Sequence, residues 1–242
     1  MPQLPRAILF DLDDTIIAAY GRPELAWSTV VGEFAAELAP LAAQNVVAAI
    51  RASGAAIRSD PERHRAMRHG LPASRRDTVA GGFERLAASG HAVPPAVLQH
   101  RIADRFTAYR EENMKLFPDA LATIAQLRAR GVKLALLTNG ASDYQRAKIV
   151  RFDLAHLFDH IQIEGEHGFG KPEERAYRHA LDALGVAAHE AWIVGDNLEW
   201  EVIAPQKLGI HAIWYDPHGG GLPAGHAARP DRVVRTLGEL LD

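Results

Sequence analysis

The sequence predicts an α/β protein, in which helices flank a parallel sheet and a helical segment is inserted into the sheet domain. Through the second half of the chain, short apolar runs alternate with helical patterns. This rhythm is typical of repeated β–α units whose sheet is buried on both faces. Between about residues 22 and 115, in contrast, only helical periodicity is present. One strand is therefore expected before the helical segment and the others after it.

The predicted elements follow in order along the chain. The first strand is expected at residues 7–10 (AILF), and two amphipathic helices at 24–38 and 96–112, where apolar residues recur at spacings of three and four. Four further apolar runs are expected to be strands: 132–138, 160–164, 191–195 and 211–215. The segment 231–241 closes the chain as a short strand or a terminal helix. We expect residues 1–20 and 116–242 to form the α/β core and residues 21–115 to form a separate α-helical domain.

Composition narrows the classes of partner. The chain has 242 residues, a formal net charge of -3 and no cysteine. This balance predicts no electrostatic footprint for nucleic acid or an anionic membrane, so a small molecule is the expected partner. The first residues lack the apolar region of a signal peptide, and no stretch approaches the ~20 apolar residues of a membrane-spanning helix. A cytoplasmic protein, monomeric or homodimeric, is expected.

Polar residues follow the predicted strands, at the edge where parallel sheets bind ligands. They are Asp11 and Asp13 after the first strand, Thr138 and Asn139 after the second, Lys171 beyond the third and Asp196 after the fourth.

Each of these residues also has an ordinary interpretation. Asp13 or Asp14 could cap a following helix, residues 138–140 could form a turn, and Lys171 could be a solvated loop residue. Asp196 could begin a helix. Four independent strand ends nevertheless bring carboxylates, a hydroxyl, an amide and an ammonium to one sheet edge, and chance is the weaker explanation.

Electrostatics explains why such acids would be kept together. Two carboxylates about 4 Å apart repel by roughly 4 kcal/mol at an effective dielectric near 20. A divalent cation relieves this repulsion, and a site of oxygen ligands with a phosphate favours Mg²⁺. One aspartate could then attack phosphorus, and a second, two residues further on, could protonate the leaving oxygen. Lys171 and Thr138 would hold the phosphoryl oxygens.

Four motifs, "DLDDT", "LLTNG", "GKP" and "VGDNLEWE", occur in this order. Together they resemble those of the haloacid dehalogenase (HAD) superfamily, and specifically its phosphatases. The resemblance implies a Rossmann-like core with a helical cap inserted between the first and second motifs. It also implies roles for individual residues: Asp11 as nucleophile, Asp13 as general acid and base, Thr138 and Lys171 as phosphate ligands with Asn139 beside them, and Mg²⁺ held by Asp11, the Asp13 main-chain carbonyl and Asp196.

One residue departs from the family pattern. The fourth motif commonly ends in a second aspartate, where this chain has Glu201. Its longer side chain could reach the metal through water or could instead orient Lys171. Asp13 favours phosphate esters over carbon–halogen bonds, because cleavage of the latter needs no leaving-group proton. Phosphomutase, dehalogenase and a non-catalytic binding protein of the same superfamily remain as alternatives.

The substrate is expected to be a small phosphomonoester, such as a sugar phosphate, phosphoglycolate, a nucleotide or acylneuraminate 9-phosphate. Several side chains of the helical segment could contact the rest of it, although solvated helix faces explain each of them: Arg22, His64, His69, Arg76 and Arg110. His156 and His160 stand at helical spacing, but without a third ligand they predict a solvated or capping role.

Overall fold

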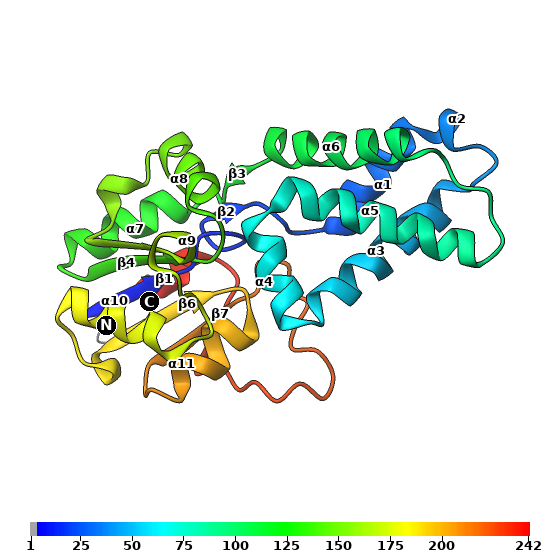
Figure 1. The fold of residues 1–242 in the computed structure, drawn as a ribbon. Coiled ribbons are helices and arrows are strands. Elements are labelled where there is room, and N and C mark those ends of the chain that lie inside the picture. Colours follow the sequence, from blue (N-terminus) through cyan, green and yellow to red (C-terminus); the bar gives the residue numbers. More distant parts are fainter. Residues whose placement is uncertain (1–3) are drawn as a thin grey trace. The chain divides into compact units, whose positions relative to one another are not determined.

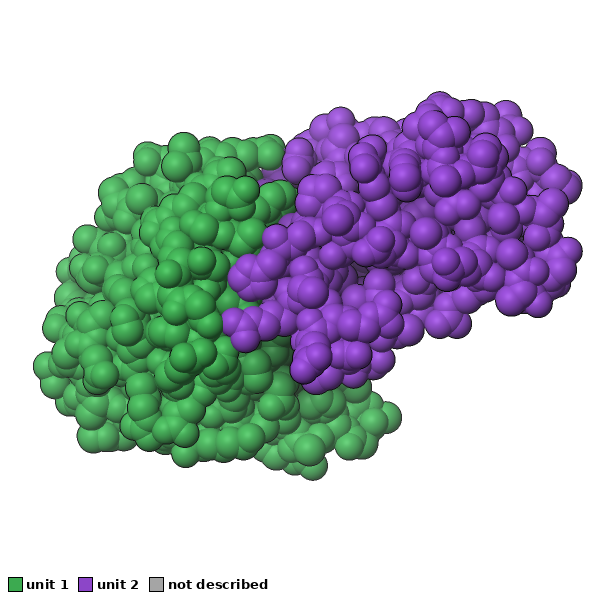
Figure 2. Space-filling model, viewed as in Figure 1, with its two compact units in different colours: residues 1–18, 115–242 green, residues 19–114 purple. Residues whose placement is uncertain are grey.

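The computed structural model of the chain describes residues 4–242. The chain divides into two compact units, Met1–Ala18 with Lys115–Asp242 and Ala19–Met114 (Figure 2). The units change after residues 18 and 114, where boundaries after residues 20 and 115 were expected. The first unit is therefore discontinuous in sequence, and the second is a single insertion.

The first unit contains a six-stranded sheet whose strands are all parallel (Figure 1). Its spatial order is β5 (His160–Ile163), β4 (Lys133–Thr138), β1 (Ala7–Phe10), β6 (Ala191–Gly195), β7 (His211–Tyr215) and β8 (Arg232–Val234). The predicted α/β class is confirmed. The first strand lies in the middle of the sheet, where Phe10 pairs with Leu136 on one side and Val194 on the other. Consequently, the ends of β4, β1 and β6 are neighbours.

Helices accompany the strands of this unit: α7 (Ala120–Ala129), α8 (Ser142–Arg151), α9 (Glu164–His167), α10 (Glu174–Leu184) and α11 (Ala204–Gln206). One face of the sheet packs on α10, whose Tyr177 and Leu181 join a core containing Leu9 and Ile193. All four residues of β1 are fully buried. A strand covered on both faces of its sheet needs apolar residues at every position, which explains its continuous apolar sequence.

A two-stranded antiparallel ribbon lies where the chain leaves and re-enters the first unit. In it, β2 (Ile17–Ala18) pairs with β3 (Lys115–Leu116). The sequence analysis did not predict these strands, because two residues are too few to show alternation. The ribbon also rules out one ordinary interpretation of the aspartates: a turn and a strand, not a helix, follow Asp13 and Asp14.

The second unit is entirely helical, with α1 (Pro23–Glu33), α2 (Ala35–Leu38), α3 (Ala43–Arg58), α4 (Pro61–His69), α5 (Leu71–Ala88) and α6 (Ala96–Glu112). The helix predicted at 96–112 is confirmed, whereas the one predicted at 24–38 is interrupted at Phe34. In the core of the unit, Trp27 stacks on Phe106 with ring centroids 3.5 Å apart. A Cβ at Gly82 would come within 2.8 Å of the Ile50 Cα, so this glycine allows α3 and α5 to approach closely.

Two local predictions are refined. His156 lies in a 3₁₀ turn, η1 (Ala155–Leu157), and His160 in β5, so the expectation of a shared helical spacing was wrong. The end of the chain forms both alternatives in succession, β8 and a 3₁₀ helix, η4 (Leu237–Leu241).

Among residues 4–242, no helix has the length and apolar character needed to cross a bilayer.

Candidate active site

The candidate site begins at the end of β1. Asp11 directly follows this strand, and its N–H donates to the Val194 carbonyl at 3.0 Å, which extends the sheet pairing by one residue. The chain then turns, with the N–H groups of Ile16 and Ile17 both bonded to the Leu12 carbonyl at 3.0 Å. This turn returns Thr15 to Asp11, whose Oδ2 accepts the Thr15 hydroxyl at 3.0 Å. Asp11 is thereby fixed within a largely buried setting.

Lys171 lies against two carboxylates in the interior of the first unit. Its Nζ is 2.6 Å from Asp11 Oδ1 and 2.7 Å from Glu201 Oε1, and only 2 % of the residue is exposed. The interpretation of Lys171 as a solvated loop residue is therefore wrong. The attraction of Asp11 and Glu201 raises the pKa of Lys171 although burial opposes it, so the amine is an ammonium.

Asn139 positions the loop that carries Lys171. Its Nδ2 donates to the Lys171 carbonyl at 2.6 Å, and its Oδ1 accepts the Lys171 N–H at 2.9 Å. A Cβ at Gly170 would come within 2.8 Å of the Glu164 side chain and would also meet Asn139, so a glycine is required beside this clamp. A direct contact between Asn139 and phosphate stays a prediction.

Glu201 belongs to the turn that follows β6. Here the chain forms a π-helical turn, η3 (Leu198–Ile203), whose start is capped by Asn197. Glu201 is fully buried, and its second oxygen accepts the Asn197 N–H at 3.0 Å. Of the two roles considered for Glu201, the orientation of Lys171 is the one that these contacts support. Burial raises the pKa of Glu201 to about 7, with Lys171 acting in the opposite direction.

Asp196 lies at the end of β6, and its main-chain carbonyl accepts a hydrogen bond from Trp214 Nε1 at 2.7 Å. Measured over all its atoms, Asp196 is exposed to solvent. Desolvation of its carboxyl by surrounding atoms, followed by the charges of Asp11, Glu201 and Asp14, raises the pKa of Asp196. Burial likewise raises the pKa of Asp11, against the opposing effect of Lys171. This corner therefore holds more carboxylates than Lys171 alone can neutralise.

Asp13 is held separately from Asp11. Both of its carboxylate oxygens lie 2.7 Å from the Nζ of Lys148, and Oδ2 also accepts from Gln145 Nε2 at 3.0 Å. The Gln145 amide donates in addition to the hydroxyl oxygen of Thr138 and, at 3.0 Å, to the Asn139 carbonyl. Thr138 and Asp13 thus share one neighbour on α8.

The sequence analysis missed Gln145 and Lys148. A signal was present in the segment that became α8, because both residues lie on the face that also buries Ile149. Polar side chains on the buried face of an amphipathic helix need partners, and the sequence offered no way to identify those partners.

The candidate residues of the helical unit have partners of their own. Arg76 forms a bidentate pair with Asp104 at 2.7 and 2.9 Å, and both side chains are about half exposed. The solvated-face interpretation suits Arg76. The guanidinium of Arg110 is buried and donates to the carbonyls of Ala19 and Gly21, which supports the start of the unit.

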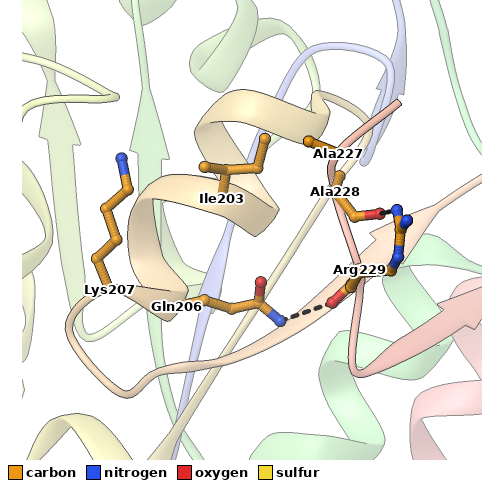
Figure 3. Close-up of a pocket in the computed structure, with 6 residues that line it drawn as sticks. All are labelled: Ile203, Gln206, Lys207, Ala227, Ala228 and Arg229. Atoms are coloured by element: carbon orange, nitrogen blue, oxygen red, sulfur yellow. Dashed lines mark hydrogen bonds between the residues drawn. The ribbon is translucent and has the colours of Figure 1, made fainter. Parts of the chain in front are cut away.

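The first unit also contains a hollow with a different set of lining residues (Figure 3). Its lining comes from η3, α11 and the loop at 227–229, where Gln206 Nε2 donates to the Arg229 carbonyl at 2.9 Å. None of the predicted site residues lines it. The candidate active site is therefore the cluster at the ends of β4, β1 and β6.

The fold and this cluster define a hydrolase of the HAD type, and comparison with known proteins agrees. A family model described as haloacid dehalogenase-like hydrolase matches residues 5–209. The chain belongs to this family.

Curated relatives include a phosphoserine phosphatase of Thermus thermophilus, 46% identical over 125 residues, covering 52% of this chain and 49% of the relative. They also include a ribulose-1,5-bisphosphate 5-phosphatase of Halopiger xanaduensis, 34% identical over 143 residues, covering 57% and 59%. The chain spans about half the length of the curated relatives it matches. Among solved structures, YfnB of Bacillus subtilis superposes with a TM-score of 0.68 at 22% identity, covering 98% of this chain and 97% of that one. This likeness shows the shared fold.

Proposed function

We propose that this hydrolase is a Mg²⁺-dependent phosphatase that cleaves a small phosphomonoester through an aspartyl-phosphate on Asp11. The observation that carries the proposal is the arrangement of two acids at one strand end, each with its own lysine. Asp11 contacts Lys171, and Asp13 contacts Lys148. Two carboxyl groups in different surroundings can serve different roles, one as nucleophile and one as proton donor.

The residues present fit a magnesium ion. Asp11 and Asp196, with the Asp13 main-chain carbonyl, would supply oxygen ligands where the carboxylates outnumber the available ammonium groups. In residues 4–242, no three His, Asp or Glu side chains by themselves form a metal-binding group. Mg²⁺ does not require one, because it commonly uses one or two carboxylates together with water and substrate oxygens. When bound, the ion would neutralise charge on the phosphoryl group.

The remaining chemistry belongs to the side chains. A carboxylate oxygen of Asp11 forms a bond to phosphorus while the ester P–O bond breaks, and the leaving oxygen receives a proton from the Asp13 carboxyl. Asp13, now a carboxylate, takes a proton from water as that water attacks the phosphorus of the aspartyl-phosphate. The P–O bond to Asp11 breaks, and inorganic phosphate and the Asp11 carboxylate result.

Lys171 and Thr138 are proposed to bind the phosphoryl oxygens. The Thr138 hydroxyl oxygen accepts from Gln145 Nε2, so its own hydrogen remains available for a phosphoryl oxygen. Lys171 places an ammonium 2.6 Å from Asp11 Oδ1, beside the carboxylate that the phosphoryl group must approach. Asn139 would act through the position of Lys171.

The substrate class follows from the relatives only as a proposal. Curated relatives are named for phosphoserine, ribulose 1,5-bisphosphate and N-acylneuraminate 9-phosphate. Each is a small phosphorylated metabolite, and we propose a substrate of this kind. The helical unit is proposed to act as the cap that selects it. A dehalogenase is disfavoured because cleavage of a carbon–halogen bond needs no proton donor. Asp13, which Lys148 and Gln145 hold in place, would then have no role in the reaction.

Asp11→Asn tests the nucleophile. The amide cannot form the acyl phosphate, so the rate of phosphate release should fall about a thousandfold or more with the fold retained. Release of phosphate from p-nitrophenyl phosphate with Mg²⁺ measures this rate, and circular dichroism checks the fold.

Asp153→Asn is the matched control, because the Asp153 side chain is 92% exposed and lies outside the cluster. Its rate should equal that of the wild type. Near-normal turnover by Asp11→Asn would show that Asp11 is not the nucleophile.

A further inference from the structure

We propose that Lys148 is a positioning residue for the proton-donating acid: with Gln145, it holds the Asp13 carboxyl toward the leaving oxygen of the substrate. This inference rests on the proposed phosphatase function and deepens it. No motif used in the sequence analysis includes either residue, and both lie on α8, whereas Asp13 lies beyond the end of β1.

The contact between Lys148 and Asp13 has the geometry of a fixed clamp. The ammonium lies 2.7 Å from both carboxylate oxygens, which fixes the position of the carboxylate, and the hydrogen bond from Gln145 to Oδ2 limits its rotation. The Lys148 side chain is only 4% exposed, against 18% for Asp13. The ammonium also lies 4.6 Å from the centre of the Tyr144 ring, which restricts its own movement. The buried Lys148 side chain therefore holds the more accessible Asp13 carboxylate in place.

Gln145 couples this clamp to the phosphate-binding side of the site. Its amide nitrogen, which carries two hydrogens, lies within hydrogen-bond distance of three acceptors: Asp13 Oδ2, the Thr138 hydroxyl oxygen and the Asn139 carbonyl. Asp13 and Thr138 therefore share a hydrogen-bond partner, Gln145, which lies about one helical turn from Lys148. A proton donor and a phosphoryl group must be placed relative to each other, because proton transfer requires hydrogen-bond reach to the ester oxygen.

A buried ion pair such as Lys148–Asp13 contributes little net stability by itself. Burying a lysine amine costs several kcal/mol before its partner compensates, and exposed ion pairs contribute about 0–1 kcal/mol. Asp11 already has an ammonium from Lys171, yet Asp13 receives a different one from another segment of the chain. Separate lysines allow the two acids to be oriented independently, as a nucleophile and a proton donor require.

The proposed role is tested most directly on the step that breaks the ester bond. As the ester P–O bond breaks, its electron pair goes to the leaving oxygen, and the proton moves to that oxygen from the Asp13 carboxyl. An alkyl leaving group depends on this proton. A p-nitrophenolate leaves without it, because the ring stabilises the negative charge.

Lys148→Met tests the inference by comparing two substrates under saturating Mg²⁺: β-glycerophosphate, an alkyl ester, and p-nitrophenyl phosphate. We expect kcat/KM, which reports the steps up to cleavage of the ester bond, to fall about a hundredfold on the alkyl ester and less than about threefold on the aryl ester. Because Asp13 also takes the proton from water in the second step, kcat should fall on both esters. Arg146→Met, which removes an exposed cation from the same helix, should leave both substrates unaffected. Lys148→Gln, which keeps a polar end, carries the same test if Lys148→Met does not fold.

The Asp13→Asn background separates positioning from direct phosphate binding. There, Lys148→Met should cause no further loss, because the group that it positions has been removed. Equal losses of kcat/KM on both esters would overturn the role of Lys148 while the phosphatase function stood. A wild-type protein that hydrolysed neither ester would instead refute the proposed function.

Discussion

At the scale of single residues, the candidate site depends on two buried ammonium groups. Lys171 bridges Asp11 and Glu201, and Lys148 is bidentate on Asp13. Lys171 belongs to the GKP motif, whereas Lys148 lies mid-helix and belongs to none of the four motifs. Their importance comes from carboxylates that are distant along the chain.

Replacing Lys171 should destabilise the protein strongly. In Lys171→Met, Asp11 and Glu201 are buried without their counter-charge, and loss of one partner of a buried ion pair costs about 3–5 kcal/mol. Denaturant unfolding measures the free energy of unfolding.

The double variant Lys171→Met/Glu201→Gln serves as the control, because it also removes the fully buried acid. It should recover part of the lost stability. A double variant as unstable as the single one would mean that the charge of Glu201 is not what Lys171 compensates.

At the scale of elements, local patterns were sufficient where an element is long. Helix α6 begins and ends where periodicity predicted, whereas α1 and α2 were predicted as one helix. The π-helical turn after β6 was not predicted, because its geometry depends on Asn197 and on space beside Gly195. That turn delivers Glu201 to Lys171.

Gly195→Ala tests this turn. An added Cβ would overlap the Glu201 side chain and lie 3.0 Å from the Asp11 Cβ. We expect a loss of about 1–3 kcal/mol in unfolding free energy, as for overpacked cores, together with at least a tenfold loss of phosphatase activity.

Gly32→Ala is the matched control. Gly32 lies in α1, and nothing is within 4 Å of an added Cβ. Its substitution should leave activity unchanged and stabilise the protein by up to about 1 kcal/mol, because alanine is the better helix former. Wild-type activity in Gly195→Ala would contradict the close packing of Glu201 against β6.

At the scale of the whole molecule, the chain passes through the α/β unit twice. Residues before Ala19 supply only β1 and one strand of the small ribbon, and the remaining five strands of the large sheet come after Lys115. The first acids therefore have their lysine partners in the second half of the chain. The contacts of Asp11 with Lys171 and of Asp13 with Lys148 span 160 and 135 residues.

Metal binding should stabilise this assembled unit. A ligand that binds only the folded state at a hundred times its Kd contributes about 2.7 kcal/mol. We expect Mg²⁺ to raise the melting temperature, and EDTA to reverse the shift and stop phosphate release. Differential scanning calorimetry at constant ionic strength measures the shift.

Asp196→Asn is the control for this effect, because it removes a proposed ligand at the more exposed end of the site. Its melting temperature should respond little to Mg²⁺. An equal response in Asp196→Asn and the wild type would mean that the stabilising ion binds elsewhere.

The sequence by itself determined the α/β class, the helical insertion and the strand ends that carry the predicted site residues. It could do so because apolar periodicity is a local property, and because parallel strands place their carboxyl ends at one edge. Only the tertiary structure decided that Asn139 clamps the Lys171 backbone, that Glu201 orients its ammonium and that Lys148 and Gln145 hold Asp13. These pairings depend on distances between segments remote in sequence, and no local pattern encodes which partner a buried charge will meet.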